Sequence, residues 1–393
     1  MDYDVIIIGG GPSGLSTALH LQRVAPSLST RTLLLEKEHY PRPKLCAGGL
    51  TLDAEILLER LDLHIDEVPH VFADDIHFDF ESKGLTVRVP KRHALRVIRR
   101  DEFDNWLAEK AKNRGLEIRE GVTAKNIMPD PTGVTVETSQ GIFRAQVVVG
   151  ADGSNGITRR CIFPKAPINT ARVLETITPV RRDVAKHPRS VAERDIQPHP
   201  GNRAYFDFFP VPENIAGYVW DFPTQVKGVP MRCWGVYDTN ILANAKRPQL
   251  REPLAKEMSR LGFDLHQYEI KGHPIRWFSP GNEMSMPRVL LVGDAVGADP
   301  VFGEGISIAL GYGVIAAHQI SQSFQRREFS FRGYRRRVLR SALGQTLIAR
   351  WVIAYLVYPI KWRWFQILLW RFLKPIVLLI AWIFVLNWGK RIR

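Results

Sequence analysis

Cysteine is scarce in this sequence, and the few cysteines form no recognisable site. The 393 residues include 3 cysteines, Cys46, Cys161 and Cys233, with no C-x-x-C pair. A small, odd number of dispersed cysteines in a long chain argues against a disulfide framework and against a zinc site. We therefore expect no metal centre and a fold held together by apolar packing, since 45% of the residues are hydrophobic.

Internal repeats and low-complexity linkers are also missing. An apolar strand pattern begins near residue 3, so we expect no signal or transit peptide before it. The length of the chain suggests two or three domains.

Acidic residues are nearly absent from the C-terminal part of the chain. From Ser321 onward there are 15 Lys and Arg residues but 1 acidic residue, Glu328, so this part carries the whole formal charge of +14. It also contains 6 of the 10 tryptophans, Trp351, Trp362, Trp364, Trp370, Trp382 and Trp388.

Three interpretations of this basic, Trp-rich part compete. Nucleic-acid binding suits basic residues interleaved with aromatic ones, but the long apolar stretches argue against it. The apolar run over 375–387 is shorter than the roughly 20 residues of a transmembrane helix. Tryptophan favours the headgroup level and basic residues favour anionic lipids. We therefore predict a helical region over 326–393 that associates with the cytoplasmic side of a membrane, as a peripheral or monotopic protein does. A helical cap packed on the rest of the molecule is the alternative.

The N-terminus carries a nucleotide-binding pattern. A continuous apolar run over 5–8 predicts a parallel strand buried on both faces, and a G-x-G-x-x-G motif follows it. The glycines of such a motif allow a sharp turn, a close backbone approach to a pyrophosphate and tight packing of the next helix. We expect the helix over 13–23 to direct its N-terminus at the phosphates. The predicted contacts are Gly9, Gly11, Pro12, Ser13 and Gly14.

A second strand, over 31–35, ends in Glu36, whose carboxylate is placed to accept the ribose hydroxyls. These residues suit NAD and FAD equally well, so the choice of cofactor depends on other segments.

Three further segments decide that choice. The segment 100–104 precedes a helical pattern, an apolar strand over 145–150 is followed by Asp152 and Gly153, and Asp294 lies in a Gly-Asp turn before a glycine-rich helix start. Together they resemble the two-domain flavoproteins typified by aromatic hydroxylases. The resemblance implies that the Gly-Asp turn holds the ribityl and phosphate part of FAD, and that the helix start faces the isoalloxazine edge. The implied FAD contacts are Arg100, Asp152, Gly153, Asp294, Gly303, Gly305 and Ile306.

Two more motifs narrow the family. Residues 40–49, Tyr-Pro-Arg-Pro-Lys-Leu-Cys-Ala-Gly-Gly, are similar to the P-R-x-K-x-C-x-G-G segment of geranylgeranyl reductases, and residues 217–223 are similar to their Y-x-W-x-F-P motif. The resemblance covers residues 1–325 and implies Lys44 as a cofactor contact and Cys46 as a catalytic residue near the flavin. Shaping the pocket and tuning the cofactor are alternative roles for this cysteine. The chain departs from the family at Ala47, where a third glycine is usual, and at Thr224, where lysine is common, which leaves the substrate open.

Alternation along a strand places Tyr218, Trp220 and Phe222 on one face, where an apolar chain would lie against them. The run over 205–210 is expected to be the hairpin partner of this strand, with the turn at 212–214. An ordinary sheet core rich in aromatic residues is the alternative. With the Cys46 segment present, we favour a substrate-binding surface.

These observations predict an α/β fold with an α+β substrate part. A Rossmann-type FAD-binding domain would comprise residues 1–60, 95–160 and 285–325, and an antiparallel-sheet substrate domain would comprise 61–94 and 161–284. The segment 185–200, rich in Pro, Arg and His, is expected to be a surface loop. Helices would complete the chain.

The predicted function is FAD-dependent reduction of carbon–carbon double bonds in an isoprenoid lipid of the geranylgeranyl type. With no second G-x-G-x-x-G motif in the chain, electrons would come from transiently bound NAD(P)H or from ferredoxin. An isolated alkene is a poor hydride acceptor, so an acid must lie close to it; the sequence does not identify that acid. The alternatives are a monooxygenase or halogenase on the same fold, and a non-catalytic, membrane-bound electron-transfer flavoprotein. The oligomeric state is not readable.

Overall fold

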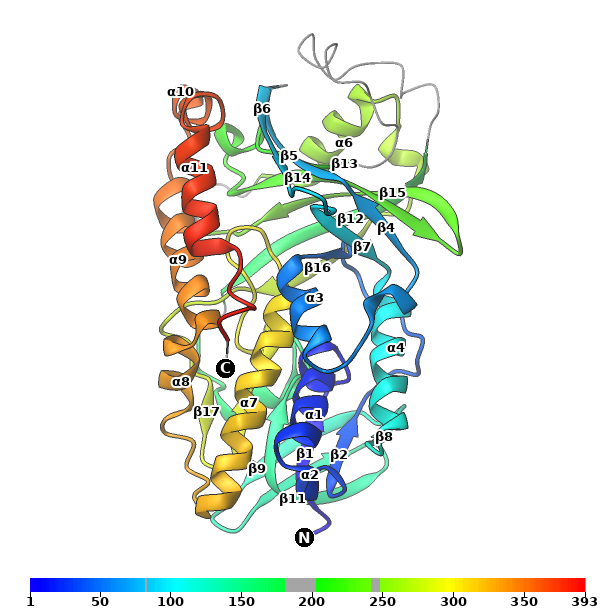
Figure 1. Cartoon of the computed structure of the whole chain (residues 1–393), viewed down its shortest axis with the longest axis vertical. Coiled ribbons are helices and arrows are strands. Elements are labelled where there is room, and N and C mark those ends of the chain that lie inside the picture. The colour runs from blue at the N-terminus through cyan, green and yellow to red at the C-terminus, as the bar shows by residue number, and fades with distance from the viewer. Residues whose placement is uncertain (82, 168, 181–202, 242–247, 393) are drawn as a thin grey trace.

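The computed structural model describes residues 1–81, 83–167, 169–180, 203–241 and 248–392. In this part of the chain the strands form three sheets, and helices cover the lower sheet and one side of the molecule (Figure 1). The predicted surface loop over 185–200 lies outside the described residues.

The first sheet contains the N-terminal strand at its centre. The strands β18, β11, β1, β2 and β8 run parallel, and β1 is buried on both faces as its apolar sequence predicts. Its strands are β1 (Tyr3–Ile8), β2 (Thr32–Leu35), β8 (Glu117–Arg119), β9 (Ala124–Pro129), β10 (Val134–Thr138), β11 (Gly141–Gly150), β17 (Ser285–Met286) and β18 (Val289–Leu291). Its helices are α1 (Pro12–Val24), α2 (Pro26–Ser29), α4 (Arg100–Asn113), α5 (Ile157–Ile162) and α7 (Ile306–Arg326).

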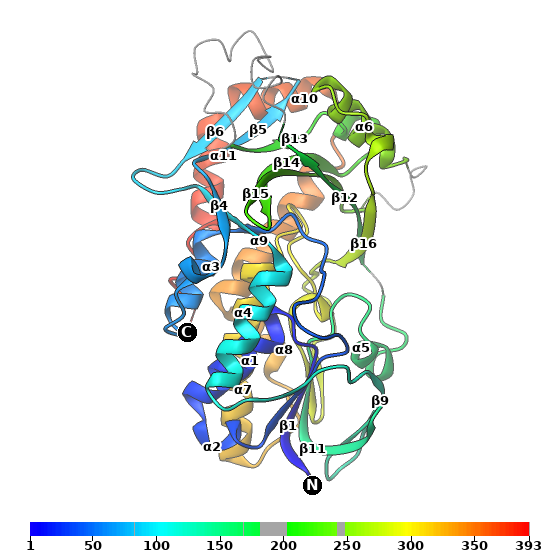
Figure 2. The same ribbon diagram turned by 90° about the vertical axis from the view of Figure 1, so that its right-hand side faces the viewer.

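The second sheet has seven described strands in the order β16-β12-β15-β14-β13-β5-β6. It lies above the first sheet in Figure 2 and is antiparallel except for the pair β13 and β5. Its strands are β5 (Asp75–Phe80), β6 (Lys83–Arg88), β12 (Thr170–Pro179), β13 (Arg203–Asp207), β14 (Gly217–Val226), β15 (Val229–Asp238) and β16 (Lys271–Arg276). The predicted hairpin is confirmed, because β13 pairs with β14 across a turn that contains η4 (Val211–Glu213).

A small third sheet joins the two larger ones. It consists of β3 (Gly49–Leu50), β7 (Leu95–Ile98) and β4 (His70–Ala73). The helices beside the second and third sheets are α3 (Leu52–Glu59), η1 (Ile65–Glu67), α6 (Arg251–Arg260) and η5 (Leu265–Gln267).

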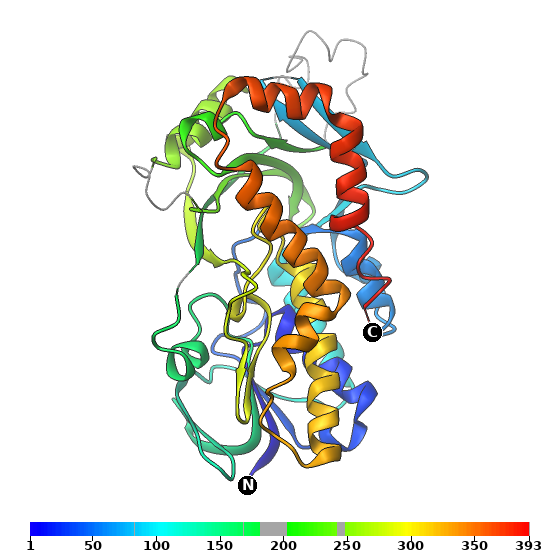
Figure 3. The same cartoon turned by 90° about the vertical axis from the view of Figure 1, so that its left-hand side faces the viewer.

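The C-terminal part is helical, and it folds back over both large sheets (Figure 3). Its elements are α8 (Tyr334–Arg340), α9 (Ala342–Val357), α10 (Arg363–Ile367), η7 (Leu368–Phe372), α11 (Lys374–Ile380) and η8 (Ala381–Val385). No single described helix is long and apolar enough to cross a membrane, although the pair Arg363–Phe372 and Lys374–Phe384, bent by 78°, passes that test together.

The predicted fold class is confirmed: a largely parallel sheet covered by helices carries a second, largely antiparallel sheet, and helices complete the chain. The boundaries proposed for the individual domains stay a prediction.

Candidate FAD and substrate site

The glycine motif adopts the geometry that its sequence predicts. Gly9 has a φ of +106°, and a Cβ there would overlap the carbonyl oxygen of Ala151. A Cβ at Gly14 would overlap the carbonyl oxygen of Gly9, so α1 packs directly on the end of β1. Helix α1 has Gly11 as its N-cap, no side-chain cap and no acid in its first turn. Its N-terminus therefore presents backbone N–H groups without a competing carboxylate, as phosphate binding requires.

Glu36 lies buried at the end of β2, beside the glycine loop. Its Oε2 accepts a hydrogen bond from the backbone N–H of Gly10 at 2.8 Å and lies 3.3 Å from the Nε of Arg42. Arg42 also lies 3.3 Å from Asp104. The sequence did not predict this arginine as part of the site, although it belongs to the Pro-Arg motif. The proposed contact of Glu36 with a ribose stays a prediction.

The Gly-Asp turn meets the glycine motif from the other side. Gly293 has a φ of +60°, and a Cβ there would overlap Ser13. The Asp294 carboxylate lies near Gly305, where a Cβ would be 3.9 Å from its Oδ1. Burial raises the pKa of Asp294, while Lys44 and Arg100 oppose that rise.

Helix α7 begins at Ile306, directly after the Gly303–Gly305 turn, with Gly305 as an N-cap that has no side-chain cap. The structure thus brings together predicted contacts from four segments far apart in sequence.

Arg100 opens helix α4 and lies beside Cys46. It donates from Nε and Nη2 to the two carboxylate oxygens of Asp104, both at 2.8 Å. The prediction that the segment 100–104 precedes the helix was wrong, because these residues form its first turns, where acids favour the helix dipole. Burial raises the pKa of the Cys46 thiol, against the effect of Arg100. Cys46 is therefore a neutral thiol at neutral pH.

Asp152 faces helix α5. Its Oδ2 accepts hydrogen bonds from the backbone N–H and the hydroxyl of Thr158, at 2.8 and 3.0 Å. Gly153 has a φ of +79° and open space where a Cβ would lie. Asp152 therefore holds the loop in place, while Gly153 leaves room beside it; cofactor contact by either stays a prediction.

The three aromatic residues of β14 are buried, with exposed fractions of 4% for Tyr218, 5% for Trp220 and 5% for Phe222. The hydroxyl of Tyr218 donates to the carbonyl of Phe302, next to the glycine-rich helix start. A Cβ at Gly49 would lie 3.3 Å from the Phe222 ring, so the end of the Cys46 loop packs on the other end of the strip. The strip thus lies between two loops that the sequence predicted to border FAD.

These features fit FAD. Two helix N-termini lack competing side chains, Gly153 has open space beside it, and Oδ1 of the buried Asp152 carboxylate has no partner among the described residues. A family model described as an FAD binding domain matches residues 2–227. The chain belongs to this family.

Two relatives of this flavoprotein extend over most of its length. An uncharacterized protein of Methanosarcina barkeri is 28% identical, over 89% of this chain and 82% of that protein. The digeranylgeranylglycerophospholipid reductase of Thermoplasma volcanium is 25% identical, over 84% of this chain and 80% of that enzyme.

Solved structures share the fold of this flavoprotein. A geranylgeranyl bacteriochlorophyll reductase-like protein from Thermoplasma acidophilum has a TM-score of 0.75 at 22% identity, with 99% of this chain and 98% of that chain covered. The flavin-dependent brominase Bmp2 has a TM-score of 0.68 at 20% identity, with 100% and 94% covered. The predicted resemblance to geranylgeranyl reductases is confirmed, and the chain is an FAD-dependent oxidoreductase.

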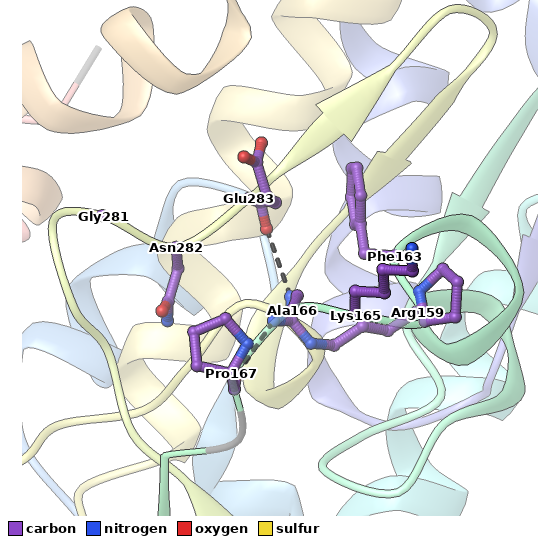
Figure 4. Close-up of a pocket in the computed structure, with 9 residues that line it drawn as sticks. Arg159, Phe163, Lys165, Ala166, Pro167, Gly281, Asn282 and Glu283 are labelled. Atoms are coloured by element: carbon purple, nitrogen blue, oxygen red, sulfur yellow. Dashed lines mark hydrogen bonds between the residues drawn. The ribbon is translucent and has the colours of Figure 1, made fainter.

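A cavity of about 420 Å³ lies apart from the residues predicted for the site (Figure 4). Arg159, at 4% exposure, contributes to its wall and donates to the carbonyls of Glu283 and Pro167 at 3.3 and 3.4 Å. None of the residues predicted from sequence lines this cavity.

Two titratable residues that the sequence analysis did not identify lie near the Cys46 loop. Glu175 on β12 is buried, and the backbone N–H of Cys46 donates to its carboxylate. Burial lowers the pKa of His273 on β16 to about 4, with Lys44 and Arg100 adding to the effect, so this imidazole is neutral. Neither residue belongs to a local motif. An isolated acid on the apolar face of a strand was the one signal for Glu175.

Proposed function

We propose that this flavoprotein reduces carbon–carbon double bonds in an isoprenoid lipid of the geranylgeranyl type. The observation that carries the proposal is the packing of the Cys46 loop against the aromatic strip, at the contact between Gly49 and Phe222. The two motifs shared with geranylgeranyl reductases are 168 residues or more apart in sequence yet pack against each other. The similarity to the digeranylgeranylglycerophospholipid reductase supports the same substrate class.

The aromatic strip continues toward the C-terminal helices. The ring of Tyr218 lies 4.9 Å from Phe206, Phe206 lies 5.1 Å from Phe78, and Phe78 lies 5.9 Å from Trp370 of η7. A polyprenyl chain has the length and apolar character to follow such a row. The aromatic row therefore supports a long hydrocarbon substrate that reaches the site from the C-terminal side.

FAD, when bound and reduced, supplies the hydride. Electrons for FAD would come from NAD(P)H or ferredoxin. The protein's own part is to hold the alkene against the aromatic face, to keep water away from it and to supply a proton.

The C-terminal helices offer a surface for a membrane. Large apolar side chains are exposed along this region, with Trp362 at 63%, Phe372 at 71% and Trp382 at 66%. The same part of the chain contains the basic residues that account for its net charge. Exposed tryptophan with basic neighbours suits the headgroup level of an anionic bilayer. We propose that this region binds the cytoplasmic side of a membrane and collects the lipid there.

An anaerobic titration tests this function. The flavin of the detergent-solubilised holoenzyme is reduced, a geranylgeranyl glycerophospholipid is added, and flavin absorbance is followed. Reoxidation is expected with this lipid, and none is expected with its fully saturated analogue, which has no bond to reduce. A flavin that stays reduced with every prenyl lipid would contradict the proposal.

The same experiment separates the alternatives. The fold likeness to the brominase keeps halogenation and monooxygenation as rivals. Those reactions require oxygen, so reoxidation only after oxygen is admitted would favour them. Tight FAD binding with no substrate-dependent reoxidation under either condition would favour an electron-transfer protein.

A further inference from the structure

Glu175 is a buried acid on the face of the sheet that carries the aromatic strip. It lies on β12 with an exposed fraction of 5%. Residues alternate across a strand, and Ala171 and Val173 pack in the same core as the aromatic strip. Leu174 packs instead against the core on the other face. The Glu175 side chain therefore points to the substrate-facing side of the sheet.

The strand register places Glu175 in one row with Trp220. Gly235 of β15 is the partner of Trp220 on one side and of Glu175 on the other. A Cβ at Gly235 would overlap the Trp220 indole, so the ring extends across this glycine toward β12. The absence of a side chain at Gly235 thus brings the ring to the acid.

The Cys46 loop closes the other side of this acid. The backbone N–H of Cys46 donates to the Glu175 carboxylate. Among the described residues its Oε2 has no hydrogen-bond partner. The Cys46 N–H thus lies at the carboxylate, whose Oε2 is buried without a hydrogen-bond partner among the described residues, although buried carboxylates are ordinarily hydrogen-bonded. A buried, unpaired carboxyl oxygen beside an aromatic substrate surface is available for proton transfer.

We propose that Glu175 is the proton donor for the reduction of the alkene. This assignment rests on the proposed function. The O–H bond of the Glu175 carboxyl breaks as a C–H bond forms at one alkene carbon, and the hydride adds to the other. The π bond is consumed, the two electrons come from the reductant that loaded the cofactor, and the carboxylate regains its proton from water.

Burial, opposed by nearby cations, places the titration of this acid near neutral pH. Burial raises the pKa of Glu175 to about 7. The groups that face it from neighbouring elements are Arg99, Lys44, Lys271, Cys46 and Cys233. The three cations and the Cys46 N–H oppose the rise without cancelling it. A carboxyl with this pKa is largely protonated below pH 7 and loses its proton above it, as an acid working near neutral pH requires.

The first test compares single-turnover reoxidation of the reduced holoenzyme in Glu175→Gln, Glu175→Asp and Asp207→Asn. Asp207 is a matched control, because it is a buried acid on the opposite face of the same sheet, with its pKa raised by burial to about 8. Glu175→Gln should slow reoxidation by the geranylgeranyl lipid about 100-fold or more. FAD affinity and lipid affinity should stay within about twofold, since the amide keeps the shape of the side chain. Glu175→Asp should retain part of the wild-type reoxidation rate. Asp207→Asn should reoxidise as fast as the wild type.

The pH profile provides a second readout. The wild-type rate should be constant at acid pH and fall above pH 7, as the carboxyl ionises. Glu175→Gln should lose this dependence.

Infrared titration of the protein provides a readout without turnover. The difference spectrum between the wild type and Glu175→Gln should contain a protonated-carboxyl C=O band that disappears with a midpoint near pH 7, and Asp207→Asn should keep that band. A difference spectrum without such a band would overturn the assignment.

Failure of this assignment is distinguishable from failure of the proposed function. If the wild type reduces the lipid and Glu175→Gln does so at the same rate, Glu175 is not the proton donor. The proposed reductase function then still stands. If the wild type reduces no prenyl lipid, both are overturned.

Discussion

Cys46 lies in the loop that packs on the aromatic strip through Gly49, and we propose that its thiol takes part in alkene reduction, a role that substitution can separate from FAD binding. The thiol faces Arg100, and its backbone N–H faces Glu175. Cys46→Ala removes a neutral side chain but none of the phosphate-binding backbone. We expect FAD affinity to stay within about twofold while alkene reduction falls about tenfold, less than the roughly 100-fold loss expected on removing a proton donor, because Cys46 would position the loop beside Glu175.

Cys161→Ala is the control for that substitution, because Cys161 is a half-buried cysteine whose thiol lies 3.5 Å from Asn126, remote in the fold from the Cys46 loop. Stopped-flow measurement of flavin reoxidation gives the rate of alkene reduction, and titration with FAD gives the FAD affinity. Unchanged turnover in Cys46→Ala would remove the thiol from the mechanism.

At the residue scale, the motifs predicted which residues gather but not how they pair. Gly9 and Gly293 were predictable because other residues adopt their positive φ only at a cost, and Gly14 because a Cβ there would overlap the carbonyl oxygen of Gly9. The pairing of Glu36 with Arg42 was not, because it depends on how the loop folds back across the glycine motif. Glu175 could not be predicted as a site residue either, because its position depends on the register of β12, β15 and β14.

Helix α1 must pack tightly on β1 for the phosphate-binding turn to form. Gly14→Ala would place a Cβ against the carbonyl oxygen of Gly9 and displace the helix. We expect a loss of about 1–3 kcal/mol in the free energy of unfolding, together with loss of FAD binding. Chemical denaturation and a fluorescence titration with FAD measure the two effects.

Gly333→Ala is the matched control, because Gly333 has open space where its Cβ would lie. It should leave both quantities unchanged. An FAD affinity for Gly14→Ala equal to that of the wild type would contradict the assigned role of the motif.

Helix α9 is tied to the loop before α7 by a buried ion-pair network. Nη1 of Arg350 lies 2.9 Å from Asp299 and 2.6 Å from Glu304. Burial alone would raise the pKa of Glu304, but Arg350 and the hydroxyls of Ser307 and Thr51 hold it below its usual range.

Arg350→Met should lower the free energy of unfolding by about 3–5 kcal/mol, because it leaves two buried carboxylates without their cation. The loss should be smaller at low pH, where both carboxylates are protonated, so denaturation is measured at two pH values. Arg340→Met, at an exposed position on α8, should cost nothing measurable. Equal stability of the two variants would contradict this account of the network.

At the element scale, sequence periodicity predicted the β13–β14 hairpin and the strand–helix order of the FAD part. It predicted helices at the C-terminus but not that α9 would dock on the glycine-rich loop. That docking depends on Arg350 meeting Asp299, and a pair 51 residues apart leaves no local signal.

At the scale of the whole molecule, the C-terminal helices expose large apolar side chains, and this part of the chain carries the net positive charge. The purified protein should bind vesicles that contain anionic phospholipid, and binding should weaken as salt rises, because basic residues contribute part of the attraction. Trp382→Glu combined with Phe384→Glu should weaken binding at least about tenfold in a vesicle sedimentation assay, since two inserted aromatic side chains become charged.

Ile142→Glu is the control for membrane binding, because Ile142 is 67% exposed on β11 in the FAD-binding half. It should bind as the wild type does. Vesicle binding that changes neither with salt concentration nor with the Trp382 and Phe384 substitutions would contradict the membrane proposal.

The central claim is that the two motifs form one site for the reduction of a prenyl double bond. Mass spectrometry of the lipid after an anaerobic single turnover of the reduced holoenzyme tests it most directly. The account predicts a product that has gained two hydrogen atoms per reduced bond and no oxygen. A lipid unchanged under these conditions, or modified only with oxygen or halogen after air is admitted, would contradict it.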